Sequence, residues 1–277
     1  MQMMCAWNKF LEIIPKRLIN EVNPIGKEKL LELRLRRGCP AELRFLDKVC
    51  SVGQCVTRDE LEYCVNVSSQ YSPWASSSIA KGYITAPGGH RIGICGEAVV
   101  KDGIMTGVRN ISSLCIRVAR DFPGIARKAG RINESTIIIG APGWGKTTLL
   151  RDVIRTLSSE HFIAVVDERG ELFPEAFSET PRTDVLTGCP KASGIETLLR
   201  CMGPEYIAVD EITAEEDTEA LLRAHGSGIN LLATAHAGSL EDFFGRMTYR
   251  KLIEHNVFKK ALVLRNDKSF TSERILA

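Results

Sequence analysis

Residues 140–148 read Gly140, Ala141, Pro142, Gly143, Trp144, Gly145, Lys146, Thr147 and Thr148. This stretch matches the pattern G-x-x-x-x-G-K-[ST], in which a glycine-rich loop surrounds phosphate groups. The apolar, β-branched run before it, residues 135–139, is typical of a buried parallel strand. After it, apolar residues recur with helical spacing over residues 146–157. The order of strand, glycine loop and helix predicts a site for a nucleoside triphosphate.

The residues of this loop are suited to bind a triphosphate. Backbone N–H groups at the start of a helix attract anions, and the helix dipole adds to this attraction. Gly143 and Gly145 allow the backbone to approach a phosphate closely. Lys146 is expected to reach the β- and γ-phosphates, and the Thr147 hydroxyl to bind Mg²⁺. We therefore expect ATP and Mg²⁺ as ligands and residues 140–148 as the nucleotide-binding residues.

The composition is typical of a soluble globular protein. Of its 277 residues, 44% are hydrophobic and 25% are charged, and no apolar run approaches the roughly 18–20 residues that span a bilayer. The N-terminus lacks the basic and apolar regions of a signal peptide. The nine cysteines include no Cys-x-x-Cys pair, which argues against a disulfide framework and a zinc site. We expect a reducing cytosolic compartment.

Charge is distributed unevenly along the chain. Residues 1–130 hold 19 basic and 12 acidic side chains, a net charge of +7. The remaining residues hold 17 basic and 22 acidic side chains, a net charge of −5. Two ordinary solvated surfaces would explain this difference. Alternatively, the basic part docks on an acidic neighbour or contacts nucleic acid.

The pattern of apolar residues divides the chain into residues 1–125 and residues 126–277. In the first part we expect helices at 5–19, 57–68 and 74–81, strands at 31–36 and 41–45, and a meander with strands at 91–100, 104–108 and 114–119. In the second part we expect strands at 136–139, 162–166, 206–209 and 230–235 and helices at 146–158, 192–202 and 214–225. Alternation of this kind predicts a mostly parallel sheet covered by helices, as in P-loop NTPases. The fold class is therefore α/β, preceded by a small α+β domain.

Two carboxylates follow the expected strand 206–209. Asp210 is suited to hold the magnesium ion, directly or through water. Glu211 is suited to polarise the attacking water as a general base. The ordinary alternative is the solvated acidic start of a helix, but the phosphate-binding loop favours the functional interpretation.

A second expected strand, 162–166, also ends in acidic residues. If this strand adjoins the strand of the phosphate-binding loop, its end lies near the γ-phosphate. Glu168 or Glu171 would then be an alternative general base. A polar loop without catalytic function is the other interpretation, and the residues alone do not decide between Glu168, Glu171 and Glu211.

His236 follows the expected strand 230–235, next to small residues. A histidine at this position could sense the γ-phosphate or position water, and it need not shift its pKa to do so. Single histidines are more often structural, but the end of a core strand favours the functional interpretation. His225 is expected to lie near the C-terminal end of a helix instead.

Phosphoryl transfer also needs positive charge at the γ-phosphate, often from an arginine of another subunit. Four arginines cluster in the last strands of the basic part: Arg91, Arg109, Arg117 and Arg120. On spacing alone, most of them would be surface cations.

Together and in this order, the four strand-end motifs resemble those of the type II and type IV secretion ATPases, RecA-like hexamers that include pilus motors. The Walker A loop, Asp box, Walker B strand and His box of that superfamily match residues 140–147, 167–171, 207–211 and 234–236. A closer similarity is to the stage III sporulation protein AA family of endospore-forming bacteria. It is carried by residues 89–96, 109–120, 166–169 and 233–236, and it extends over nearly the whole chain.

This resemblance implies a RecA-like ATPase in the mother-cell cytoplasm that powers the channel between mother cell and forespore. It implies a hexameric ring that reaches the membrane through a membrane-embedded channel protein of the same operon. It also implies that the N-terminal domain presents arginines to a neighbouring nucleotide site, with Arg109 and Arg117 as candidates and Arg91 behind them.

Two other classes of function fit parts of the sequence. RecA-like cores also drive nucleic-acid translocation, and residues 1–130 are basic. No aromatic residues interleave these basic ones as a stacking platform, so we do not expect nucleic acid as a partner. A nucleotide-switched scaffold without turnover is the third class; the presence of Lys146, Thr147, Asp210 and an acidic base argues against it.

Overall fold

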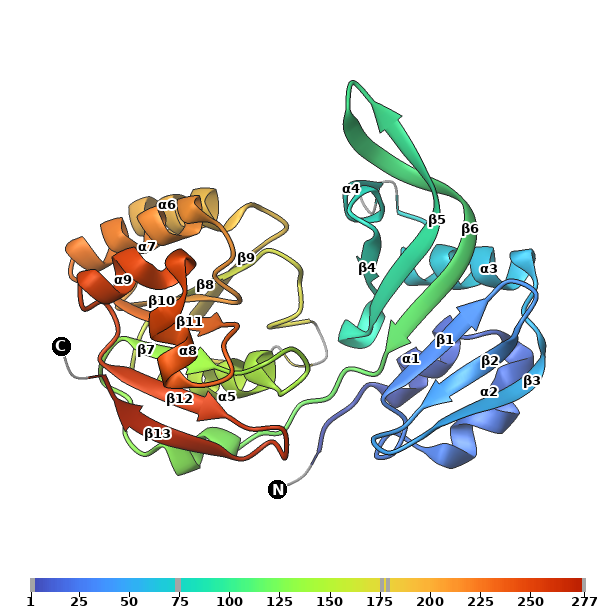
Figure 1. Ribbon diagram of the computed structural model, residues 1–277, viewed down its shortest axis with the longest axis horizontal. Helices are drawn as coiled ribbons and strands as arrows, with labels where there is room; N and C mark the ends of the chain where they lie inside the picture. Colours follow the sequence, from blue (N-terminus) through green and yellow to red (C-terminus); the bar gives the residue numbers. More distant parts are fainter. Residues whose placement is uncertain (1–2, 73–75, 175–176, 178–179, 276–277) are drawn as a thin grey trace. The chain divides into compact units, whose positions relative to one another are not determined.

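Two β-sheets organise the part of the chain that the computed structural model describes, residues 3–72, 76–174, 177 and 180–275. Each sheet belongs to one of two units (Figure 1). The N-terminal unit comprises Met4–Asp121 and Pro174–Phe177. The C-terminal unit comprises Met1–Met3, Phe122–Phe173 and Ser178–Ala277.

The N-terminal unit is a six-stranded antiparallel sheet in the order β3-β2-β1-β6-β5-β4. Its strands are β1 (Glu32–Arg36), β2 (Pro40–Arg44), β3 (Val49–Cys55), β4 (Tyr83–Thr85), β5 (Arg91–Lys101) and β6 (Ile104–Arg117). Its helices are α1 (Trp7–Ile13), α2 (Lys16–Val22), α3 (Arg58–Ser68) and α4 (Ser76–Ala80). Helix residues such as Phe10 and Leu18 share one buried core with strand residues such as Leu33 and Ile116.

Local sequence explains most of these elements. Pro15 has no N–H to donate, and it separates α1 from α2 within the helix expected at residues 5–19. The N-terminus of α3 has the predicted capping box: Glu60 N–H donates to Thr57 Oγ1 over 3.3 Å, and Thr57 N–H donates to Glu60 Oε2 over 2.9 Å. Strand β6 runs unbroken where the sequence predicted two strands, and β3 was not predicted. Residues 74 and 75 of the helix expected at 74–81 lie outside the described residues.

The C-terminal unit is a seven-stranded sheet in the order β13-β12-β7-β11-β10-β8-β9. Its strands are β7 (Thr136–Ile139), β8 (Ile163–Asp167), β9 (Thr183–Thr187), β10 (Tyr206–Val209), β11 (Asn230–Ala235), β12 (Lys260–Leu264) and β13 (Phe270–Arg274). Its helices are α5 (Lys146–Leu157), α6 (Lys191–Met202), α7 (Glu215–Gly226), α8 (Leu240–Gly245) and α9 (Arg250–Glu254). All neighbouring strands are parallel except β12 and β13. The predicted α/β class with a mostly parallel sheet is confirmed.

Helices cover both faces of this sheet. Ile138 of β7 belongs to the core that contains Leu150 and Val153 of α5. Ile137 and Ile139, which point to the opposite face, belong to the core built with α6, α7 and α9. Because both faces are buried, the central strands are continuous apolar runs rather than alternating ones.

The strand register brings several polar residues to one edge of the sheet. Val209 of β10 is level with Val166 of β8 and with Ala233 of β11. Asp210 therefore lies between Asp167 and Thr234. Strands β10 and β11 separate β8 from β7, so β8 does not adjoin the strand of the phosphate-binding loop. The condition under which Glu168 or Glu171 would reach the γ-phosphate is not met.

Candidate active site

The loop between β7 and α5 has glycines in the conformations that a phosphate-binding loop requires. Gly143 and Gly145 adopt φ values of +76° and +100°, in the left-handed region that favours glycine. Gly145 is the N-cap of α5 and provides no side chain, so the first N–H groups of the helix remain available to a ligand. Gly140 is held close to β12, because an added Cβ would lie 3.1 Å from Leu264 Cβ. The predicted loop geometry is therefore present.

Lys146 lies buried beneath this loop. Its ammonium group donates hydrogen bonds to Gly140 O (2.8 Å) and Ala141 O (3.2 Å) and to His236 Nδ1 (3.0 Å). Burial lowers the pKa of Lys146, and the carboxylates of Asp210 and Glu211 partly oppose that change. The side chain is thus a desolvated cation beside a ring nitrogen.

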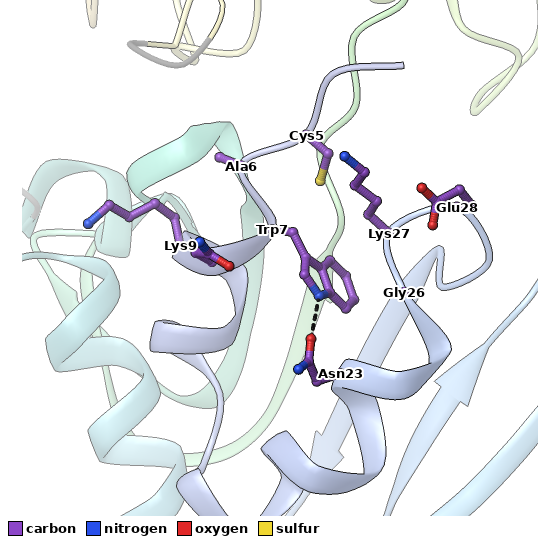
Figure 2. A pocket seen from close by; sticks show the side chains of 9 residues that line it. Cys5, Ala6, Trp7, Lys9, Asn23, Gly26, Lys27 and Glu28 are labelled. Atoms are coloured by element: carbon purple, nitrogen blue, oxygen red, sulfur yellow. Dashed lines mark hydrogen bonds between the residues drawn. The ribbon is translucent and has the colours of Figure 1, made fainter. Parts of the chain in front are cut away.

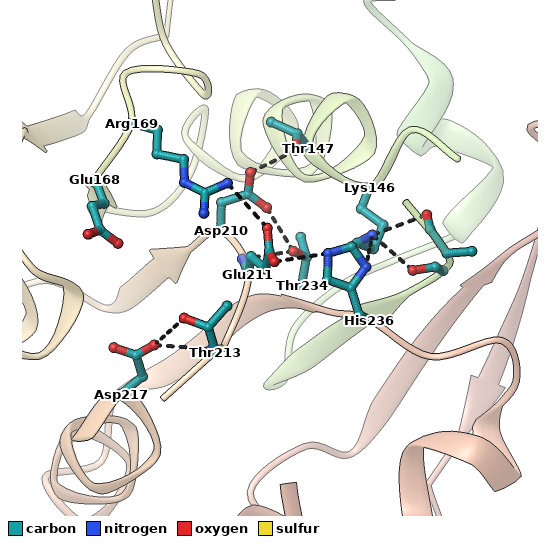
Figure 3. A network of polar contacts seen from close by, with 12 residues as sticks. Lys146, Thr147, Glu168, Arg169, Asp210, Glu211, Thr213, Asp217, Thr234 and His236 are labelled. Atoms are coloured by element: carbon teal, nitrogen blue, oxygen red, sulfur yellow. Dashed lines mark hydrogen bonds and ion pairs between the residues drawn. The ribbon is translucent and has the colours of Figure 1, made fainter. Parts of the chain in front are cut away.

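His236 connects Lys146 to Glu211 (Figure 3). Because the lysine donates to Nδ1, the imidazole proton is on Nε2, which lies 2.9 Å from Glu211 Oε1 and donates to it. The backbone N–H of His236 donates to the Tyr249 hydroxyl over 3.1 Å, which fixes the chain just after β11. The three side chains form one continuous hydrogen-bonded row.

Asp210 is held by two hydroxyl groups. Thr147 Oγ1 donates to Oδ2 and Thr234 Oγ1 donates to Oδ1, each over 2.7 Å. Thr234 Oγ1 also accepts the N–H of Glu211 over 2.9 Å. One threonine of β11 therefore positions both acidic residues that follow β10.

Glu211 has an unusual backbone conformation. Its φ is +52°, in the left-handed region, which costs a non-glycine residue about 1–2 kcal/mol. Such strain is often found at functional sites. The conformation is stabilised by the Thr234 hydroxyl and by Ile212 N–H, which donates to Thr234 O over 3.0 Å. The Arg169 guanidinium lies 3.6 Å from Glu211 Oε2.

The other acidic candidates have different partners. Glu168 Oε2 lies 2.7 Å from Nζ of Lys191, which is buried at the start of α6. The same Nζ lies 3.6 Å from Asp217 Oδ2. Glu171 uses its backbone: its N–H donates to Asp167 Oδ1 over 2.9 Å, and its carbonyl accepts from Arg151 over 2.6 Å. Neither Glu168 nor Glu171 belongs to the row of Lys146, His236 and Glu211.

The candidate arginines belong to the N-terminal unit. Arg109 Nε lies 3.1 Å from Glu97 Oε2, and Arg117 Nε lies 3.7 Å from Glu32 Oε2. Arg91 lies over the ring of Tyr83, 5.0 Å from its centroid. Arg120 donates to the carbonyl groups of Lys27 and Leu30. Arg109 and Arg117 are more exposed than their acidic partners, so they remain candidates for a contact with another subunit.

The N-terminal unit also has a concavity of about 540 Å³ beside α1 and α2 (Figure 2). Among the residues that line it, Trp7 Nε1 donates to Asn23 Oδ1 over 2.9 Å. Burial raises the pKa of the Cys5 thiol to about 11, so Cys5 is not a reactive thiolate at neutral pH. This concavity has no arrangement typical of a catalytic site.

Three residues that support the site were not among the sequence candidates. Thr234 lies in the Thr-x-His motif, but only the register of β10 and β11 places it beside Asp210. Lys191 and Tyr249 have no local motif that could have identified them. Their roles depend on contacts between segments far apart in the sequence.

Comparison with known proteins assigns the family. The model of the family described as "Sporulation stage III, protein AA" matches residues 7–274. The chain belongs to this family. It is 34% identical to stage III sporulation protein AA of Bacillus subtilis (strain 168). The alignment is 285 positions long and covers 94% of this chain and 92% of that protein. The family resemblance seen in the sequence is confirmed.

Two solved structures with a similar fold are an ATPase and a pilus motor. The ATPase DotB of Legionella pneumophila has a TM-score of 0.58 and 19% identity, over 94% of this chain and 78% of that one. The pilus retraction motor PilT has a TM-score of 0.61 and 16% identity, over 91% of this chain and 78% of that one. This member of the sporulation family thus shares its fold with the ATPase DotB and the pilus retraction motor PilT. Among the described residues, no helix is both long and apolar enough to cross a bilayer.

Proposed function

We propose that this chain binds ATP with Mg²⁺ and hydrolyses it. The observation that carries the proposal is the convergence of Lys146, Thr147, Asp210, Glu211 and His236 at one edge of the sheet, from three separate segments. The fold relative PilT was solved with bound ADP, which supports nucleotide binding by this chain.

The residues fit a triphosphate and a magnesium ion. The N–H groups of the loop 140–145 and the first turn of α5 receive the phosphates, and Lys146 neutralises their charge. Thr147 Oγ1 and the Asp210 carboxylate are hard oxygen donors 2.7 Å apart, a pair suited to a magnesium ion that also contacts phosphates. When bound, the ion supplies charge neutralisation at the transferring phosphoryl group.

Glu211 accepts the proton of the attacking water in this proposal. His236 Nε2–H occupies Oε1, so Oε2 is the oxygen that takes up the proton. The Lys146 ammonium donates to His236. A bound phosphate would compete with His236 for this ammonium, while His236 Nε2–H would still hold Glu211. The row therefore couples nucleotide binding to the position of the base.

We also propose that the chain acts as a hexameric motor ring in the mother-cell cytoplasm. The ring contacts a membrane-embedded channel protein of the same operon and powers the channel between mother cell and forespore. Membership of a sporulation family and a fold shared with DotB and PilT support this role. Arg109 and Arg117 complete the nucleotide site of a neighbouring subunit.

Phosphate release with Mg²⁺-ATP tests the enzymatic part. We expect turnover by the wild type, no nucleotide binding by Lys146→Ala, and binding with almost no turnover by Glu211→Gln. Lys259→Ala, a change of an exposed lysine, is the control and should behave as the wild type. Equal turnover in all four proteins would contradict the proposal.

Light scattering after size exclusion tests the ring. The Glu211→Gln protein with Mg²⁺-ATP should reach about six times the 30.6 kDa of one chain. Arg109→Ala and Arg117→Ala should lower hydrolysis and leave ATP binding by the isolated subunit unchanged. A monomer with and without nucleotide, or wild-type hydrolysis in both arginine variants, would contradict the ring with shared sites.

A further inference from the structure

The hairpin of β12 and β13 places a lysine on the phosphate-binding loop. Strand β12 is parallel to β7, with Val263 level with Ile139, so both strands end at the same edge of the sheet. The turn after β12 contains Lys268, whose ammonium group donates a hydrogen bond to the carbonyl oxygen of Gly143. Gly143 is in the middle of the loop that is expected to surround the phosphates.

The turn that carries Lys268 is well defined. Arg265 N–H donates to Ser269 O over 2.9 Å, and Lys268 N–H donates to Arg265 O over 3.0 Å. Asp267 Oδ1 accepts from both the N–H and the hydroxyl of Ser269, over 2.9 and 2.6 Å. Lys268 has a φ of +68°, a conformation that favours glycine. The chain thus keeps a lysine where glycine would relieve strain, which suggests a role for the side chain.

No carboxylate among the described residues balances the charge of Lys268. Within the described part of the chain, its ammonium group makes no ion pair, and its hydrogen-bond partner is a neutral carbonyl. Although Lys268 is largely exposed, desolvation of its ammonium group beside the loop lowers its pKa, and no acidic group is among the causes. An ammonium group has three N–H donors, so two of them remain for a ligand.

We propose that Lys268 is a further nucleotide-binding residue, which contacts the diphosphate part shared by ADP and ATP. The N–H groups of the loop around Gly143 point to bound phosphate, so a lysine on the Gly143 carbonyl is within side-chain reach of that phosphate. Lys146 lies beneath the loop and would approach the phosphates from the N-terminal end of α5. Lys268 would approach them from the β12–β13 turn. This inference rests on the proposed nucleotide site.

Binding of fluorescent MANT-ADP and MANT-ATP tests the inference. Lys268→Met should weaken both by about tenfold, because a charge-assisted hydrogen bond is lost. KM for ATP should rise and kcat should change little, and Lys268→Arg should restore most of the affinity. Added salt should weaken binding to the wild type more than binding to Lys268→Met, a difference that a purely structural role would not produce.

Lys260→Met is the matched control. Lys260 lies on the same hairpin and also donates to backbone carbonyls, those of Ala129 (2.8 Å) and Arg131 (2.9 Å), at the other end of β12. It should bind both nucleotides as the wild type does. Unchanged affinity in Lys268→Met, or an equal loss in Lys260→Met, would overturn the inference. If the wild type bound no nucleotide, the proposed function itself would fail.

Discussion

Strands β8 and β10 of the C-terminal unit end in the same tripeptide, Val-Asp-Glu, at residues 166–168 and 209–211. The strands are hydrogen-bonded neighbours, and Val166 is level with Val209. The two aspartates nevertheless differ. Asp167 is buried and accepts three backbone N–H groups, those of Glu171, Leu172 and Phe173. Asp210 accepts two threonine hydroxyls, those of Thr147 in α5 and Thr234 in β11.

The two glutamates differ as well. Glu168 pairs with the buried Lys191, whereas Glu211 accepts from His236 and has a strained backbone. The aspartate at the end of β8 therefore fixes the backbone of the loop that follows. The two acidic residues after β10 instead contact hydroxyl groups, which can rotate, and an imidazole, which can transfer a proton. Identical local sequence acquires different roles because β10 is next to β11 and β8 is not. Substitutions at equivalent positions test this difference.

The largest contrast is expected between Glu211→Gln and Glu168→Gln. Loss of a general base should lower the kcat for ATP hydrolysis by about 10³-fold in Glu211→Gln. Glu168→Gln keeps a hydrogen-bond acceptor for Lys191 and should lower kcat by less than about tenfold. Single-turnover phosphate release measures both, with MANT-ATP affinity as the control for folding. The reverse order would place the base after β8 and break the comparison.

Removing Lys191 should destabilise the end of β8 strongly. In Lys191→Met the carboxylates of Glu168 and Asp217 lose their shared cation, and breaking a buried ion pair costs about 3 kcal/mol of unfolding free energy. Urea denaturation measures this loss. Lys251→Met is the matched control, since Lys251 also contacts two carboxylates but on an exposed surface, and we expect no measurable change there. Equal stability of both variants would contradict the structural role of Lys191.

The fold could be predicted where its signals are local. The glycine pattern predicted the loop 140–148, and continuous apolar runs predicted β7, β8, β10 and β11. The edge strands β9 and β13 were missed, because their residues are partly exposed and form no apolar run. Strand β12 was missed although it is mostly buried; its five residues begin with Lys260 and follow a short helix.

The site could be predicted only in part, for a related reason. Lys146, Thr147, Asp210 and Glu211 belong to motifs that require particular residues at fixed spacing, and the structure places them together. The different surroundings of Glu168 and Glu211 depend on strand order, which the two Val-Asp-Glu tripeptides do not encode. The partners that separate their roles, Lys191 and Thr234, come from other segments of the chain.

A smaller contrast, in unfolding free energy and in ATP binding, is expected between Asp167→Asn and Asp210→Asn. An amide in place of Asp167 has one acceptor oxygen for three buried N–H groups, so unfolding free energy should fall by about 2 kcal/mol. Around Asp210 the threonine hydroxyls can rotate, so the substitution should change stability by less than about 0.5 kcal/mol and weaken Mg²⁺-dependent ATP binding about tenfold. Thermal unfolding and MANT-ATP titration with and without Mg²⁺ separate the two effects.

The pH dependence of stability sharpens the same contrast. Burial is the main cause that raises the pKa of Asp167 above its ordinary value of 3.8. The folded protein therefore binds this proton more tightly than the unfolded chain does. The contribution of Asp167 to stability should fall as pH rises from 3.8 through the raised pKa, and Asp167→Asn should lack that fall. A fall of the same size in Asp167→Asn would assign it to another group.

The smallest effect on kcat is expected for Arg169, where the ends of β8 and β10 meet. Arg169 directly follows Glu168 in the chain, and its guanidinium lies 3.6 Å from Glu211 Oε2. Because Arg169 is partly exposed, Arg169→Gln should lower kcat only about threefold, with KM for ATP unchanged. In a Glu211→Gln background the same substitution should have no further effect, since the charge that it orients is gone. A threefold loss in both backgrounds would mean that Arg169 acts independently of Glu211, and the end of β8 would then contribute to catalysis in its own right.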